Sequence, residues 1–376
     1  MSDLVARIGR GVAAFDAAEW DACAGIDNPF TTHAFLSTLE ESGSATARTG
    51  WQPVPLAIDG EDGRAAAVLP AYVKSHSQGE YVFDHAWADA WERAGGDYYP
   101  KLQIAVPFTP VPGRRLLTTH DDLALGLIGA AEAVVQQNDL SSAHATFIAA
   151  EEVPLFDAAG WLIRADTQFH WHNDGYASFD DFLAALSSRK RKAVRKERAA
   201  ALEGLTVDHV TGAAITEAHW DAFWEFYQDT GSRKWGRPYL TRRFFSLLGE
   251  RMADRILLIF ALRDGRPIAG ALNMIGADTL YGRYWGTIAE VPHLHFEICY
   301  YQAIDAAIAR GLARVEAGAQ GSHKLARGYR PVPTFSAHYL PDPGFRRAVA
   351  DFLEREREAV GHEIADLDAM TPFRKA

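Results

Sequence analysis

One order of predicted secondary structure occurs twice in this chain, and this repetition restricts the fold more than any single motif does. In the first half, helical segments within residues 1–50 precede two apolar segments, 51–58 and 65–73, which flank a turn with the sequence DGEDG. In the second half, two helical segments precede the apolar segments ILLIFALR and IAGALNMIG, which flank the turn DGRP. Apolar segments joined by a turn rich in Gly and Asp predict β-hairpins. The chain therefore predicts two similar α/β halves.

Length and a change of composition place the boundary between these halves. A chain of 376 residues can bury the cores of two domains. Because the composition shifts near residue 175, we predict an N-terminal domain of residues 1–168 and a C-terminal domain of residues 169–376. The predicted fold class is α/β (α+β), with mixed central sheets flanked by helices.

Composition also excludes several classes of protein. A net charge of −11 argues against a general nucleic-acid coat, although a local basic patch is compatible with it. No apolar run approaches the roughly 20 residues that cross a bilayer, and the N-terminus lacks the apolar segment of a secretory signal. Cys23 and Cys299 lie far apart and match no disulfide or metal pattern. We expect a cytoplasmic protein without a membrane span, whose oligomeric state the sequence does not determine.

The segment from residue 79 to 116 is rich in aromatic and proline residues. Trp87 and Trp91 share one face of a predicted helix, and the prolines after residue 106 exclude a regular helix or central strand there. One interpretation is a core helix followed by a Pro-rich loop. The other is a wall of a substrate site, because function gathers on aromatic and polar loops. That wall would consist of Asp84, His85, Tyr99 and Lys101.

A pair of histidines follows a predicted strand at residues 161–168. His170 and His172 are two residues apart, so on a strand they share a face, which is a geometry that metals use. Only Asp174 stands nearby as a further ligand. We therefore predict histidines that line a substrate pocket, and no metal site.

A strongly basic segment lies in a predicted helix that Ser178 caps and that continues to about residue 204. Seven of the ten residues from Arg189 to Arg198 are basic. Arg191, Arg195 and Arg198 are spaced to share a helix face. Such a run is often only a solvated surface. In an acidic chain, however, it favours binding of phosphates or of a nucleic-acid backbone.

The segment from Phe296 to Tyr339 combines a predicted helix, a short strand and a Gly-rich basic loop. Glycines allow the backbone to approach a ligand closely, and ligands collect at strand ends in open α/β folds. Arg283 and Trp285 end the preceding strand and should lie near the same pocket. The polar candidates in the segment itself are Glu297, Glu316, Gln320, His323, Lys324 and Arg327.

The order of several short motifs resembles the FemAB-type aminoacyl and acyl transferases, which belong to the GNAT-like acyltransferase fold. These motifs are the basic pair at residues 195–196, YQDTGSR, ALRDGRPIA, the segment from Tyr281 to Gly286, and Gly318 to Lys324 followed by Gly-Tyr. The stretches FDHAWADAWERAGGDYYPKL and FHWHNDGY are similar to a branch of predicted N-acyltransferases and peptidoglycan-biosynthesis-like proteins. The resemblance covers nearly the whole chain and implies two tandem GNAT-like domains.

This resemblance implies transfer of an acyl or aminoacyl group from an activated donor to the amine of a small acceptor, which is phosphorylated or lipid-like in some family members. The donor would be an acyl thioester such as acyl-CoA, an acyl carrier or an aminoacyl-tRNA, with no permanently bound cofactor. Lys324 matches the basic residue that stabilises the carbonyl oxygen or the donor. The residues that would bind phosphate or line the acceptor site are Arg191, Arg195, Arg233, Trp235 and Arg237.

One segment departs from the pattern of acetyl-CoA users. They carry Q/R-x-x-G-x-G/A before the long helix, where backbone amides bind the pyrophosphate. Here the same position reads GTIAEVPHLHFE, without those glycines. A standard CoA site in the second half is therefore doubtful.

Amide formation requires an oxyanion stabiliser and a proton acceptor. Besides Lys324, we take His323 and Glu316 as catalytic candidates, since His323 titrates nearest to neutral pH and Glu316 leaves the strand close to the loop. Two structural alternatives remain, in which Glu316 pairs with Arg327 and His323 only forms hydrogen bonds. The other hypotheses are a non-catalytic protein that binds a cell-wall or lipid precursor, and a metalloenzyme that uses the two histidines.

Overall fold

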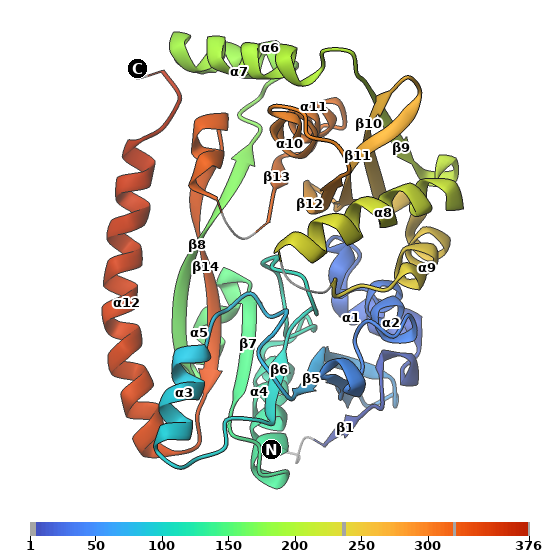
Figure 1. Cartoon of the computed structure of the whole chain (residues 1–376). Coiled ribbons are helices and arrows are strands. Elements are labelled where there is room, and N and C mark those ends of the chain that lie inside the picture. The colour runs from blue at the N-terminus through green and yellow to red at the C-terminus, as the bar shows by residue number, and fades with distance from the viewer. Residues whose placement is uncertain (1–4, 235–237, 319–320, 375–376) are drawn as a thin grey trace. The chain divides into compact units, whose positions relative to one another are not determined.

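The computed structural model describes residues 5–234, 238–318 and 321–374. The chain forms two compact units. Unit 1 comprises Met1–Asp166 and Pro333–His362, and unit 2 comprises Thr167–Val332 and Glu363–Ala376 (Figure 1). None of the helices in the described ranges is long and apolar enough to cross a membrane.

Unit 1 contains a small sheet, a larger sheet and the helices that cover them. Its small sheet has the order β1-β3-β4, and its larger sheet runs β2-β5-β6-β7-β14. The strands are β1 (Ala6–Ile8), β2 (Trp51–Pro53), β3 (Leu56–Asp59), β4 (Ala65–Leu69), β5 (Ala71–Lys74), β6 (Lys101–Ile104), β7 (Ala143–Ile148) and β14 (Arg330–Tyr339). The helices are α1 (Ala17–Ala24), α2 (His33–Glu41), α3 (His85–Arg93), α4 (Asp121–Gln137) and α5 (Val153–Ala158).

The apolar pattern explains the core of unit 1. Helix α4 connects the parallel strands β6 and β7 and buries Leu127, Ile128 and Ala131 against them. The predicted first hairpin is present, since β3 and β4 pair antiparallel. However, each predicted strand is split in two, because prolines between the segments cannot donate to a β-ladder. These are Pro55, between β2 and β3, and Pro70, between β4 and β5.

Unit 2 has a sheet of the order β8-β13-β12-β11-β10-β9. All neighbouring strands in it are antiparallel except β12 and β13, which are parallel. The strands are β8 (Leu162–His172), β9 (Thr206–Thr211), β10 (Ile256–Arg263), β11 (Arg266–Ile275), β12 (Thr279–Thr287) and β13 (Arg314–Glu316). The helices are α6 (Phe179–Ala185), α7 (Ser188–Ala201), α8 (Glu217–Lys234), α9 (Arg242–Met252), α10 (Leu294–Phe296), a π-helical segment (Glu297–Tyr301) and α11 (Gln302–Ala309).

The predicted continuous helix from residue 178 to 204 is interrupted, so this prediction was wrong. Leu186 is extended and bridges Phe373, and the amide of Ser187 donates to the carbonyl of Pro372 at 3.0 Å. These contacts with the C-terminal segment hold the backbone out of helical geometry. Helix α7 therefore begins separately, and its basic residues lie on an element of their own.

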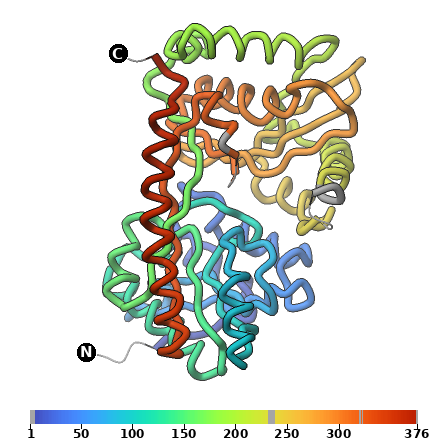
Figure 2. Tube along the Cα trace, turned by 60° about the vertical axis from the view of Figure 1, so that its left-hand side comes forward, coloured from blue at the N-terminus to red at the C-terminus, as the bar shows by residue number. Residues whose placement is uncertain are grey.

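The C-terminal part of the chain divides differently from the predicted domains 1–168 and 169–376. Residues 333–362 belong to unit 1, because β14 pairs with β7 and because α12 (Pro343–Ala369) packs against α3. Phe345 of α12 stacks on Trp91 of α3 with ring centroids 4.7 Å apart. Figure 2 shows α12 as one long helix. Whether each unit folds as an independent domain stays a prediction.

Candidate functional site

The parallel strands β12 and β13 separate after a short stretch of pairing, and a cavity lies where they part. Their register runs from Thr279 opposite Arg314 to Tyr281 opposite Glu316. Beyond that point the strand ends line a cavity of about 130 Å³. Its lining residues include Asn273, Gly282, Arg283, Tyr284, Trp285, His295, Cys299, Tyr300 and Gly318. The sheet thus opens at the centre of unit 2, next to the Gly-rich loop.

Asn273 is the buried polar side chain of β11 at this cavity. The register of β11 on β12 shifts between Leu272 and Asn273, and such irregularities often re-aim a side chain. The amide Nδ2 donates to the carbonyl of Leu257 at 3.2 Å, and the side chain is fully buried. Its Oδ1 accepts no hydrogen bond from the described residues. An unsatisfied buried acceptor calls for an explanation, and a ligand N–H would satisfy it.

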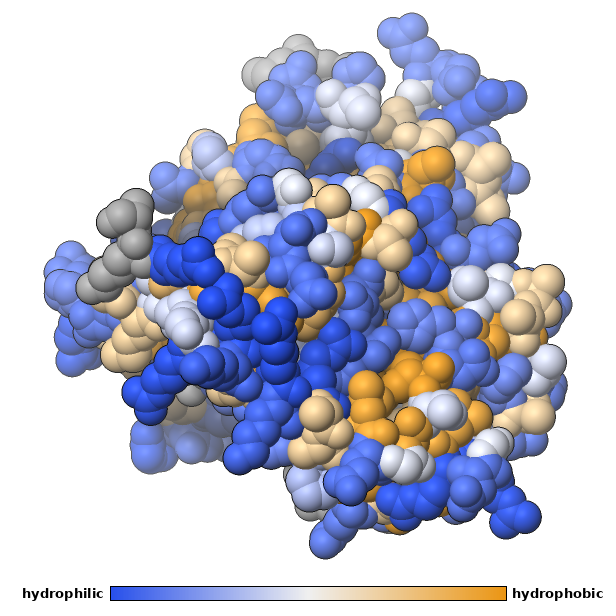
Figure 3. All heavy atoms as spheres, turned by 90° about the horizontal axis from the view of Figure 1, so that it is seen from above, coloured by the Kyte–Doolittle hydropathy of each residue, from blue (hydrophilic) through white to orange (hydrophobic). Residues whose placement is uncertain are grey.

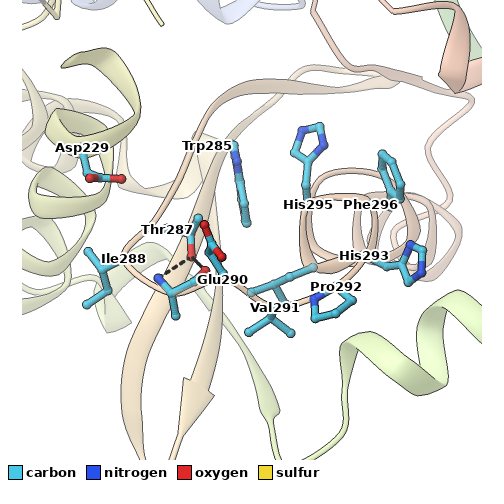
Figure 4. Close-up of a pocket in the computed structure, with 12 residues that line it drawn as sticks. Asp229, Trp285, Thr287, Ile288, Glu290, Val291, Pro292, His293, His295 and Phe296 are labelled. Atoms are coloured by element: carbon cyan, nitrogen blue, oxygen red, sulfur yellow. Dashed lines mark hydrogen bonds between the residues drawn. The ribbon is translucent and has the colours of Figure 1, made fainter. Parts of the chain in front are cut away.

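A larger cleft of about 790 Å³ adjoins this cavity. Trp285 and His295 line both spaces, with ring centroids 5.3 Å apart. Figure 4 shows Asp229 of α8 on one side of the cleft and the residues of α10 on the other. The connection from β12 to α10 forms the wall between them. Unit 2 therefore has room for a substrate that reaches into the strand opening.

Backbone amides and acidic side chains occur in the wall of this cleft. Thr287 Oγ1 accepts a hydrogen bond from the amide of Ala289 at 3.1 Å, and the amide of Ile288 donates to the carbonyl of Ile268 at 3.0 Å. Two amides are thus engaged within the protein. Glu290 and Asp229 add carboxylates to the lining, which would repel phosphate groups.

Lys324 lies next to the small cavity on a short 3-10 helix, Ser322–Arg327. The side chain is 1% exposed, and Nζ donates to the carbonyl of Gly318 at 2.8 Å. Gly318, which lines the cavity, has a positive φ of 79° that favours glycine. Burial lowers the pKa of Lys324 to about 7. Both the ammonium and the free amine form of Lys324 are therefore populated near neutral pH.

His323 and Arg327 flank Lys324 on the same 3-10 helix. The His323 ring is exposed, and its Nε2 lies 2.9 Å from the hydroxyl of Tyr300. Arg327 pairs with Glu197 of α7 at 3.0 Å and donates to the carbonyl of His323 at 2.8 Å. Arg327 thus pairs with Glu197 rather than with Glu316. The arginine instead fastens the loop that carries Lys324 to α7.

Glu316 ends β13 as a buried carboxyl group. It is 6% exposed, and burial raises its pKa to about 8, against the opposing charges of Arg314 and Arg283. His170 Nδ1 lies 3.8 Å from Glu316 Oε1, and burial lowers the pKa of His170 to about 3. Both groups are therefore mainly neutral at pH 7. Glu316 then acts more readily as a proton donor than as a base.

The other predicted histidine, His172, is half-buried, and burial lowers its pKa. Within residues 5–234, 238–318 and 321–374, no group of three or more His, Cys, Asp or Glu is placed to hold a metal ion. His170 therefore belongs with Glu316, on the neighbouring strand.

Replacing Glu316 by glutamine should change the pH dependence of stability in a defined direction. The pKa of this carboxyl is raised from 4.5 to about 8 on folding. The contribution of the Glu316 carboxyl to the free energy of unfolding is therefore fully present below pH 4.5 and is lost as the pH rises through 8. Relative to Glu316→Gln, the wild type should lose about 1.4 kcal/mol of unfolding free energy per pH unit between these values. Urea unfolding of both proteins from pH 5 to 9 measures this, and parallel curves would contradict it.

Glu297 is buried in an ion-pair network rather than open to the site. Arg198 of α7 contacts Glu297 at 3.0 Å and Asp305 at 2.9 Å, and Gln302 donates to Glu297 at 2.7 Å. Glu297 begins the π-helical segment. Irregular segments of this kind often occur at functional sites. The network fixes the segment that carries Cys299 and Tyr300.

Helix α7 presents part of its basic residues to solvent. Arg195 is exposed and pairs with Asp180 at 3.0 Å, Arg191 is half-buried, and Arg198 turns inward to Glu297. The exposed basic residues of α7 are Arg189, Lys192, Arg195 and Lys196. Figure 3, seen from above Figure 1, shows strongly hydrophilic side chains across this surface. Trp235, Arg237, Gln320 and the side chain of Arg233 lie outside the described residues.

The predicted wall in unit 1 is a closed ionic cluster. Lys101 Nζ donates to Ser77 and to Glu80, each at 2.8 Å, and also to Asp84. Lys101, Glu80 and Asp84 are each at most 4% exposed. Tyr99 is half-buried and its hydroxyl lies 2.8 Å from that of Ser77, whereas His85 is exposed. Substrate binding by Asp84, His85, Tyr99 and Lys101 therefore stays a prediction.

The Pro-rich loop of unit 1 is buried rather than exposed. Residues 105–111 are all buried, and the guanidinium of Arg115 holds the loop. It donates to the carbonyls of Val111 at 2.8 Å, Gly113 at 3.0 Å and Thr146 of β7 at 3.1 Å. These hydrogen bonds hold the buried loop against β7.

Sequence reasoning did not select Asn273, Cys299, Tyr300 or His295 as site residues. Asn273 carried a usable signal, since it is the single polar residue within the apolar strand IAGALNMIG. Cys299 and Tyr300 carried no such signal, because a regular helix was predicted where a π-helical segment turns them toward the cavity. His295, which lies in α10 just before that segment, carried none either.

The sequence matches one protein family, and the structure is similar to several solved structures. The FemAB-like family model, described as peptidoglycan biosynthesis/recognition, matches residues 11–375. No curated protein matches the sequence. FemX is similar in structure, with a TM-score of 0.56 and 12% identity over 89% of this chain and 98% of that chain. L-PGS from Bacillus licheniformis is similar with a TM-score of 0.51 and 11% identity, and the match covers 87% of this chain and 98% of that chain. A conserved protein of unknown function from Bacteroides thetaiotaomicron is similar with a TM-score of 0.53 and 11% identity, and the match covers 89% of this chain and 100% of that chain.

At these identities the solved structures show the fold alone. The predicted fold class, an α/β protein with mixed sheets flanked by helices, is confirmed, whereas the assignment of the two units as tandem GNAT-like modules stays a prediction. The family model matches almost the entire chain, so the resemblance inferred from the motif order is confirmed as well. The chain belongs to the FemAB-like family of peptidoglycan biosynthesis/recognition proteins.

Proposed function

We propose that the protein is an N-acyltransferase that moves an acyl or aminoacyl group from an activated donor to the amine of a small acceptor. Family membership and fold support an acyl or aminoacyl transferase that acts on cell-wall or lipid precursors. The reacting groups would meet in unit 2, at the opening between β12 and β13. The acceptor is an amine that carries a phosphate or a lipid-like group.

The observation that carries this proposal is the buried Lys324 beside the strand opening. Its ammonium group would stabilise the negative charge that develops on the donor carbonyl oxygen, and burial strengthens this interaction. Nζ donates to the carbonyl of Gly318, and Gly318 itself lines the cavity. A donor carbonyl in the opening would therefore lie close to the positive charge.

The amine must also lose a proton during amide formation. Since Glu316 is mainly protonated at pH 7, the better base in this region is His323, whose ring contacts Tyr300. Tyr300 lines the cavity, so its hydroxyl can relay the proton to His323. The unpaired Oδ1 of Asn273 would accept an N–H of the amine or of an aminoacyl donor.

The surroundings of the cavity favour aminoacyl-tRNA over acyl-CoA as the donor. The cleft wall has engaged amides and the carboxylate of Glu290, which does not suit the pyrophosphate of CoA. The exposed basic residues of α7, among them Lys192 and Lys196, suit a phosphate-rich molecule. An acyl thioester without a pyrophosphate is the second donor class that fits.

The test measures amide formation by the wild-type protein with a panel of phosphorylated and lipid-like amines. One arm supplies aminoacyl-tRNA, one acyl-CoA, and one an acyl thioester of N-acetylcysteamine. We expect an amide product by mass spectrometry in the first or third arm, in amounts that increase with protein concentration. If no arm yields an amide while the protein retains an amine precursor in equilibrium dialysis, the protein is a binding protein rather than a transferase.

A further inference from the structure

We propose that Cys299 is a catalytic nucleophile whose sulfur carries the acyl group between the donor and the amine. This inference rests on the proposed transferase function and assigns it a covalent, two-step course. The side chain would receive the group from an ester or thioester donor and pass it to the acceptor. Nothing in the motif order or in the family description points to this residue.

The position of Cys299 supports this role. It lies in the third position of the π-helical segment Glu297–Tyr301, is half-buried, and lines the cavity between β12 and β13 together with Trp285 and Gly318. The ion pair between Glu297 and Arg198 fixes the start of that segment. A soft nucleophile is thus held at the place where the donor carbonyl would enter.

A second observation at the same cavity points independently to a ligand. Asn273 is fully buried and lines the cavity, and its Oδ1 has no hydrogen-bond partner among the described residues. A Cβ placed on Gly282 of β12 would lie 3.5 Å from this oxygen, so the atom faces the strand opening. A group with an N–H that entered the opening would satisfy it, as an amine or an aminoacyl group does.

Lys324 supplies the charge that a cysteine nucleophile requires. Lys324 Nζ donates to the carbonyl of Gly318 at 2.8 Å, and Gly318 lines the same cavity as Cys299. A cation beside a cysteine favours the thiolate, which is the nucleophilic form. A lysine that exists partly as the free amine can take up the thiol proton and return it later.

The two steps balance in atoms and electrons. In the first, Lys324 accepts the thiol proton, Sγ forms a bond to the acyl carbon, and the bond from that carbon to the donor oxygen or sulfur breaks. The departing group takes the proton from Lys324. In the second, the amine nitrogen bonds to the acyl carbon, the carbon–sulfur bond breaks, and the amine proton passes through Tyr300 to His323, from which it returns to the departing sulfur. No oxidant or reductant takes part.

The chain contains a matched control in Cys23. This residue is buried in unit 1, its Sγ lies 3.3 Å from the carbonyl of Ala65, and burial raises the pKa of its thiol. It should therefore react slowly with electrophiles. Cys23→Ala and Cys299→Ala each remove one thiol with little change of volume.

The experiment treats the full-length protein with the acetyl and glycyl thioesters of N-acetylcysteamine and maps the adducts by mass spectrometry. We expect one acyl group on Cys299 that neutral hydroxylamine removes, the same adduct in Cys23→Ala, and none on this peptide in Cys299→Ala. Iodoacetamide should alkylate Cys299 at least about tenfold faster than Cys23, and Lys324→Met should slow this reaction. Equal alkylation rates for the two cysteines, or no adduct on Cys299, would overturn the proposal.

Failure of this inference and failure of the proposed function give different results. If Cys299→Ala forms amide at the wild-type rate, the transferase stands and the covalent step is wrong. If Cys299 becomes acylated but no amine in the panel discharges it, the nucleophile stands and transfer to amines is wrong.

Discussion

Lys324→Met is expected to lower the rate of amide formation about 100- to 1,000-fold, because loss of one oxyanion stabiliser costs about 2.7–4 kcal/mol of transition-state stabilisation. Lys324 is 1% exposed and donates to the carbonyl of Gly318 at 2.8 Å, so its charge acts in a site shielded from water. Methionine preserves most of the volume and removes the charge. The measurement is the initial rate of amide formation at saturating donor and amine.

Arg310→Met provides the matched control, since Arg310 is an exposed cation at the end of α11. It should leave the rate within about twofold of the wild type, as expected for an isolated surface charge. Thermal unfolding of both variants checks that the fold is retained. A Lys324→Met protein that is folded and forms amide at the wild-type rate would remove Lys324 from the mechanism.

Lys101→Met is expected to destabilise unit 1 by about 3–5 kcal/mol, because it leaves the buried carboxylate of Asp84 without its cation and leaves Glu80 only Lys74, at 3.8 Å. In the native protein Lys101 bonds to Glu80 at 2.8 Å and also to Asp84, and all three side chains are at most 4% exposed. Tyr98 adds a further bond to Asp84 at 2.7 Å. Urea unfolding followed by tryptophan fluorescence measures the loss.

Two further variants separate this effect from a general cost of removing a cation. Arg242→Met breaks contacts with Glu217 and Asp221, whose side chains are 64% and 73% exposed, and it should cost less than about 1 kcal/mol. Adding Asp84→Asn to Lys101→Met removes one of the stranded charges and should restore part of the stability. A Lys101→Met protein as stable as Arg242→Met would show that the cluster does not hold unit 1 together.

The strongly periodic parts of the fold were predictable from local patterns. The hairpin of β10 and β11 coincides closely with the predicted segments ILLIFALR and IAGALNMIG, and two helices, α8 and α9, precede it as predicted. Their apolar spacing or turn chemistry is complete within a few residues. By contrast, the break between α6 and α7 depends on Phe373 and Pro372, which are nearly two hundred residues away in sequence.

The candidate site likewise has features that the sequence predicts and features that it does not. The Gly-rich basic loop with Lys324, His323 and Arg327 could be selected from residue type and order alone. The sequence could not show that Arg327 pairs with Glu197, that Glu297 is enclosed by Arg198, or that Lys101 and Asp84 neutralise each other. Charged residues look alike in sequence whether they meet a substrate or another side chain, because the partner is chosen by packing.

The sequence by itself determined the family, the duplicated order of helices and hairpins, and the loop that carries Lys324. These follow from local spacing and residue type, which persist in any arrangement of the chain. Only the tertiary structure decided that β12 and β13 part beyond Tyr281, and that Asn273 and Cys299 line the opening. A cavity exists where distant segments fail to fill space together, so no single segment of the sequence records it.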